Sequence, residues 1–210
     1  MNEGSLMQKR YVFQTGLLLL LLASAASAAS ERDIRIADLT DETAPAVIIP
    51  VVADDWSMGP LGDFEQASEG AVGRALRAAG CAGEEGETLA LYGIAGLEKL
   101  LVIGLGGGVP DARALEDFGG TAAQAIVESA VVNVDLLWAG IASEAEQAGA
   151  RIAYGAALGQ YLFQKYKTDM DSSGNGKTLT IRTGSADSDS QTFEEDWRPV
   201  ADAVHFARDR

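Results

Sequence analysis

The chain has 210 residues, of which 47% are hydrophobic, so it is long enough to bury a substantial core and most simply forms one main domain. Its 16 Lys and Arg against 31 Asp and Glu give a formal net charge of −15. An acidic surface repels phosphate backbones, which argues against nucleic acid as the main partner.

Residues 1–28 have the three-part pattern of a secretory signal peptide. Lys9 and Arg10 precede an apolar run, and small residues follow, with Ala26-Ser27-Ala28 matching the A-x-A cleavage rule. The pattern predicts a periplasmic or secreted protein with no membrane attachment once the signal is removed. An uncleaved membrane anchor is the alternative, although the apolar run is short for a complete span.

Short apolar runs then alternate with longer amphipathic segments. The expected strands are residues 33–38, 46–53, 88–94, 99–106, 131–139 and 178–184, and the expected helices are 64–79, 112–130, 143–165 and 193–208. The runs on either side of Gly96 predict a hairpin, whereas Pro50 predicts an edge position or a bend for its strand. The alternation predicts one α/β domain with a mixed, mostly parallel sheet flanked by helices.

Local signals add detail to this outline. Asp111 is placed to cap the helix at 112, and Ser143 with Glu146 forms a capping-box pattern for the next helix. Residues 185–190 are expected to be a linker. The acidic run that begins there most simply keeps the linker hydrated; it comprises Asp187, Asp189, Glu194, Glu195 and Asp196.

Two helical stripes are expected to face the core. The first comprises Ile152, Ala156, Gly159, Phe163 and Tyr166, widened by Tyr154, Leu158, Tyr161 and Leu162. In that helix Gly155 and Gly159 would allow close approach to the sheet. The second stripe comprises Phe193, Trp197, Val200, Val204 and Ala207, with His205 beside it.

Three segments, taken in chain order, resemble the N-terminal domain of the leucyl aminopeptidase (cytosol aminopeptidase) family. They are EKLLVIGLG at 98–106, GAALGQYLFQKYKT at 155–168 and AVHFARD at 203–209. The resemblance covers residues 34–209. It implies a three-layer, macro-domain-like fold over residues 29–190, and a helix at 191–210 that leads toward a catalytic domain.

The same resemblance implies a function. In the family this domain packs against a metallo-aminopeptidase catalytic domain within hexamers. That catalytic domain holds two divalent metal ions, manganese or zinc, and follows the point where Arg210 ends this sequence. No catalytic residue or metal ligand can therefore be carried over. The expected role is packing and assembly, through an apolar interface with a catalytic domain or with further copies, and the intact protein would remove N-terminal residues from peptides.

Other motifs carry weaker hypotheses. Gly106, Gly107 and Gly108 follow a strand and precede a helix, so a stand-alone module that binds a nucleotide-derived ligand such as ADP-ribose is the alternative function. The sequence around 176–178 resembles the end of a phosphate-binding loop but leads into a strand.

Residues 169–180 resemble a calcium loop that lacks its closing Glu, so a hydrated loop is expected there. Cys81, expected to be half-buried in a turn, is the only cysteine, and His205 is the only histidine. Together they form neither a nucleophile–base pair nor a metal cluster.

Overall fold

The computed structural model describes residues 33–40, 42–53, 55–56, 59–127, 131–160 and 177–208. The chain divides into two units, Met1–Glu31 and Arg32–Arg210, and every described helix and strand belongs to the second. The signal segment expected at 1–28 lies outside the described residues. No helix in the described ranges is long and apolar enough to cross a membrane.

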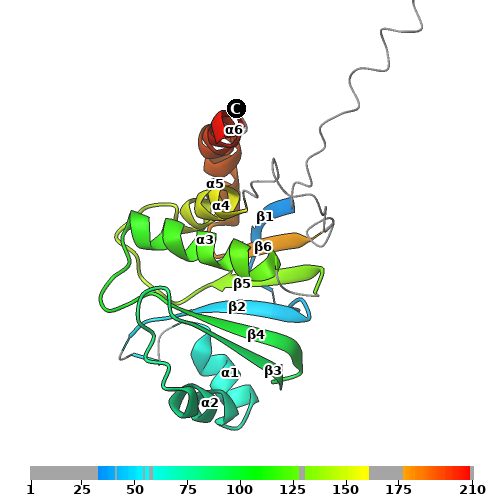
Figure 1. Cartoon of the computed structure of the whole chain (residues 1–210), viewed down its shortest axis with the longest axis vertical. Helices are drawn as coiled ribbons and strands as arrows, with labels where there is room; N and C mark the ends of the chain where they lie inside the picture. Colours follow the sequence, from blue (N-terminus) through cyan, green and yellow to red (C-terminus); the bar gives the residue numbers. More distant parts are fainter. Residues whose placement is uncertain are drawn as a thin grey trace, which may run out of the picture. The chain divides into compact units, whose positions relative to one another are not determined.

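The described strands form one six-stranded sheet (Figure 1). They are β1 (Asp33–Asp38), β2 (Ala46–Val51), β3 (Thr88–Ile94), β4 (Leu97–Gly104), β5 (Asn133–Trp138) and β6 (Thr178–Thr183). Their order is β1-β6-β5-β2-β4-β3, and neighbours are parallel except in the β3–β4 hairpin. The hairpin turns at Ala95 and Gly96, which both have positive φ, as a two-residue turn requires. The predicted mixed, mostly parallel sheet is confirmed.

Helices cover both faces of the sheet and make three layers (Figure 1). One face carries α1 (Leu61–Ala67) and α2 (Ala71–Ala79), and the other carries α3 (Ala112–Val127) and α4 (Ala148–Gly159). The chain then forms α5 (Ala186–Thr192), a π-helix η1 (Phe193–Trp197) and α6 (Arg198–Arg208), all of which contact α4.

Pro50 lies in a central strand, so the predicted edge position is wrong. Pairing of β2 with β5 ends at Ile48, whereas pairing with β4 continues through Val51. The carbonyl of Val51 accepts a hydrogen bond from the N–H of Leu105 at 2.8 Å. Because alternate residues of a strand face opposite neighbours, the nitrogen of Pro50 faces the side that β5 has already left. The missing N–H therefore breaks no pairing.

The connection from β1 to β2 crosses the sheet without a helix, and a buried ion pair holds it. The Nε of Arg182 donates to the carboxylate of Asp135 at 2.8 Å, and that carboxylate is nearly buried. The same carboxylate accepts the N–H of Ala44 at 2.9 Å, and a guanidinium nitrogen of Arg182 donates to the Asp38 carbonyl. The ion pair therefore ties both ends of the crossing segment to β5 and β6.

The single helix expected at 64–79 is two helices. Glu69 (φ 51°) and Gly70 (φ 79°) adopt left-handed conformations between α1 and α2, which an α-helix cannot contain. The carboxylate of Glu65 accepts the N–H of Gly73 at 2.6 Å and so caps the second helix. Gly80 ends α2 with φ 69°, as the sequence predicts.

The capping box expected at Ser143 and Glu146 does not form. The helix begins at Ala148, after Gln147 with φ 55°, and the Ser143 hydroxyl donates to the Ala145 carbonyl at 2.7 Å. The segment between β5 and α4 is thus a loop that is longer than the capping pattern indicates.

The linker expected at 185–190 is instead the start of α5. Asp189 is fully buried, and its carboxylate accepts hydrogen bonds from the hydroxyls of Ser185 (2.8 Å) and Thr183 (3.1 Å). The expectation that this acidic residue is hydrated is wrong. Its role is to join the end of β6 to the helix that follows.

The last helical stripe is shifted by one residue from its expected course. Phe193 and Ala201 are buried, whereas Val200 is 47% exposed. The π-helix at Phe193–Trp197 contains an extra residue in its turn, so a count at 3.6 residues per turn places the following stripe one position too early.

The helices α3 and α4 pack backbone against backbone at glycines. A Cβ on Gly155 would overlap the carbonyl oxygen of Glu116, and a Cβ on Gly119 would overlap that of Ile152. The predicted close approach at Gly155 and Gly159 is therefore confirmed, but it is made to α3 and not to the sheet. Ile152 and Ala156 are buried as expected, and the continuation of the stripe at 161–166 lies outside the described residues.

Gly155→Ala should destabilise the domain by about 1–3 kcal/mol or more, because the new methyl group forces α3 and α4 apart. Gly62→Ala is the matched control, since Gly62 is helical and nothing lies within 4 Å of its Cβ position. That change should be neutral or stabilising by up to ~1 kcal/mol. Urea denaturation of both variants measures the difference. Equal stabilities would contradict the described helix contact.

Candidate functional site

The carboxyl ends of β2 and β5 mark the place where α/β folds of this kind most often bind ligands. In such folds ligands bind where two neighbouring strands are followed by connections that run to opposite faces of the sheet. Here β2 leads to α1 on one face and β5 leads to α4 on the other (Figure 1).

That position is filled by the chain's own loops. A Cβ on Gly59 would lie 2.9 Å from the side chain of Ile141, and a Cβ on Gly140 would lie 3.4 Å from the Cα of Gly59. Ile141 is only 8% exposed. The loops after β2 and β5 are therefore in direct contact at Gly59 and Ile141.

The glycine loop after β4 is also tied down. The N–H of Gly106 donates to the Gly83 carbonyl and its carbonyl accepts the N–H of Ala53, both at 2.9 Å. At the start of α3 the Asp111 carboxylate accepts the N–H of Ala114 at 2.9 Å, which confirms the predicted cap. A carboxylate thus occupies the helix terminus where a phosphate would bind. Gly107 and Gly108 are exposed, and ligand binding there remains a prediction.

Three backbone N–H groups that could bind an anion instead bind the side chain of Glu87, a residue that no sequence motif indicated. The Glu87 carboxylate accepts the N–H groups of Ala82 (2.9 Å), Gly83 (2.9 Å) and Glu84 (3.2 Å). Burial tends to raise the pKa of Glu87, but these backbone donors outweigh it and hold the pKa below its usual value. The only feature of the sequence that indicates this arrangement is a glutamate placed four residues after the Gly-Cys-Ala-Gly turn that ends α2.

Cys81 is buried in the core beside this turn, not half-buried as expected. Its burial raises the pKa of the thiol, and the hydrogen bond with the Gly83 backbone only partly offsets this effect. A buried, protonated thiol is a poor nucleophile, so its surroundings suit packing.

Lys177, which resembled the lysine of a phosphate-binding loop, is 7% exposed. Its Nζ donates to the carbonyl of Ile126 at 3.0 Å, in the last turn of α3. A cation at a helix C-terminus interacts favourably with the helix dipole. The role of Lys177 is therefore structural.

No cluster suited to metal binding is found in the described ranges. They contain no group of three or more His, Cys, Asp and Glu side chains that could hold a metal ion. His205 lies half-buried on α6, on a different element from Cys81. The calcium-like segment at 169–176 lies outside the described residues, and Thr180 belongs to β6.

A hollow of about 660 Å³ lies beside α3. Its lining includes Glu85, Asp117, Leu158, Gly159 and Arg208. It is an open surface with mixed polarity.

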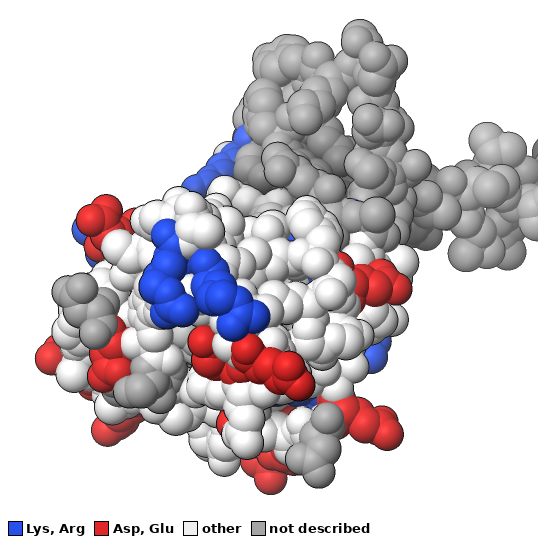
Figure 2. All heavy atoms as spheres, turned by 90° about the horizontal axis from the view of Figure 1, so that it is seen from below, with Lys and Arg blue, Asp and Glu red and all other residues white. Residues whose placement is uncertain are grey.

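On the face shown in Figure 2, a small group of basic side chains lies directly beside acidic ones, and most of the surface is uncharged.

Comparison with known proteins places these features in context. The model of the cytosol aminopeptidase family, N-terminal domain, matches residues 48–170. The chain belongs to this family. A probable cytosol aminopeptidase of Caulobacter vibrioides is 32% identical over 147 residues, a span that is 68% of this chain and 29% of the relative. This N-terminal domain therefore spans less than a third of that aminopeptidase.

Solved structures confirm the fold. A mutant of tomato leucine aminopeptidase matches with a TM-score of 0.69 at 18% identity, over 85% of this chain and 37% of its own. The macrodomain of Thermus aquaticus DarG matches with a TM-score of 0.53 at 12% identity, over 73% of this chain and 99% of its own. The aminopeptidase-family domain thus has the expected macro-domain-like fold.

Glu87→Gln should lower the melting temperature at neutral pH, because it removes the charge that holds three backbone N–H groups. A lowered pKa in the folded state stabilises the fold above the unfolded-state pKa, and this contribution is lost as pH falls through the folded-state pKa. The difference from wild type should therefore shrink in acid. Melting curves across that pH range measure it, with Glu84→Gln as the control of equal charge. A difference that does not change with pH would contradict the assignment.

Proposed function

We propose that this chain is the non-catalytic N-terminal domain of an exported, leucyl-aminopeptidase-type metallopeptidase. Its role is packing and assembly, against a catalytic domain or against further copies. The intact protein removes N-terminal residues from peptides and uses two divalent metal ions, manganese or zinc, held outside this domain. The observation that carries this proposal is that the matching family model is that of the N-terminal domain, over residues 48–170.

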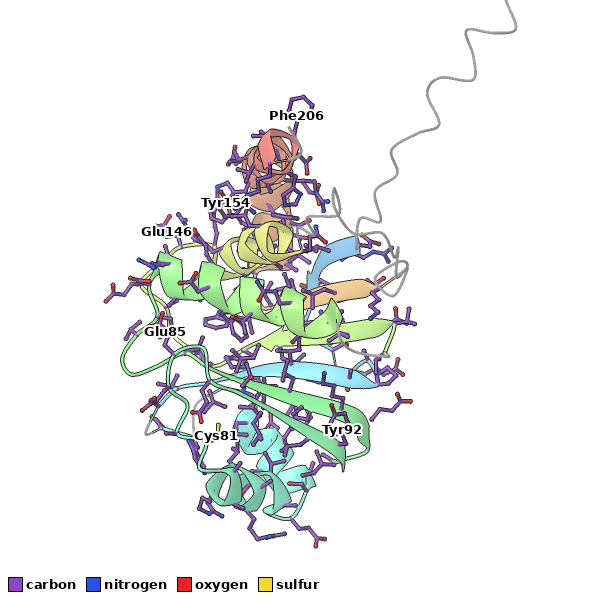
Figure 3. The ribbon with its side chains drawn as sticks, in the orientation of Figure 1. Cys81, Glu85, Tyr92, Glu146, Tyr154 and Phe206 are labelled. Atoms are coloured by element: carbon purple, nitrogen blue, oxygen red, sulfur yellow. The ribbon has the colours of Figure 1, made fainter. Side chains whose placement is uncertain are left out.

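Exposed apolar side chains support the packing role. On α6 Phe206 is 61% and Val200 is 47% exposed, and Figure 3 shows Phe206 near the C-terminal end of that helix. The hollow along α3 opens beside Arg208 of the same helix.

The purified chain should show no turnover of leucine p-nitroanilide with manganese or zinc. Sequencing the DNA beyond the codon for Arg210 complements this assay, since an in-frame continuation into the family's metal-binding region supports the aminopeptidase assignment. Turnover that is lost with a chelator would contradict the non-catalytic role.

Binding of a nucleotide-derived ligand is the second candidate, favoured by the near-complete match to a macrodomain. The contact of Gly59 with Ile141 and the cap at Asp111 argue against it. Calorimetry with ADP-ribose separates the two candidates, because saturable heat would favour the binding module and its absence would favour the assembly domain.

Export rests on the signal pattern at 1–28. The protein recovered from the periplasm or medium should begin at Ala29, and Ala28→Leu should block processing because the cleavage site requires a small residue. Val132→Leu is a control outside the signal. Recovery of the uncleaved chain from the cytosol alone would contradict export.

A further inference from the structure

We draw no further inference here: the strongest candidate, the hollow beside α3, has the carboxylates of Glu116 and Asp117 in its lining already paired with Arg151 and Arg113, and nothing in the structure shows what would bind there.

Discussion

The contact between the backbones of α3 and α4 fixes the helix against which α5, η1 and α6 pack. Glycines at Gly119 and Gly155 remove the Cβ atoms that would otherwise hold the two helices apart. With α4 held against α3, its Tyr154 contacts Trp197 of the π-helix with the rings tilted by 59° and their centroids 5.6 Å apart, and Arg151 lies over the same Trp197 ring. The direction of α6, and so the exposure of its apolar side chains, depends on this contact between Tyr154 and Trp197.

Several groups that resemble parts of a ligand site are engaged in contacts within the described part of the chain. The edge where related folds hold ligands is closed by the contact of Gly59 with Ile141, and the helix terminus beside it is capped by Asp111. Polar groups that resemble binding residues, Glu87 and Lys177, are already used to hold a turn and a helix end.

The sequence predicts the elements that local chemistry determines. Apolar runs locate the strands, the turn at Gly96 locates the hairpin, and Asp111 locates a helix start. Prediction from the sequence fails where a residue that is distant along the chain determines the local structure. Asp189 looks like a hydrated linker residue until the hydroxyls of β6 are placed beside it. Pro50 looks like an edge residue because only the register shows that β5 has already diverged. The family resemblance predicts the fold correctly, whereas only the structure shows that β3 lies at an edge of the sheet.

The central claim is that this polypeptide is a scaffold whose working partner lies outside it. Native mass spectrometry of the purified chain tests this most directly, since it preserves bound ligands and subunits. The account predicts only the masses of the polypeptide and of any oligomer of it, without a small-molecule or metal adduct. A stoichiometric adduct of a nucleotide-sized ligand, or of two divalent ions, would contradict it.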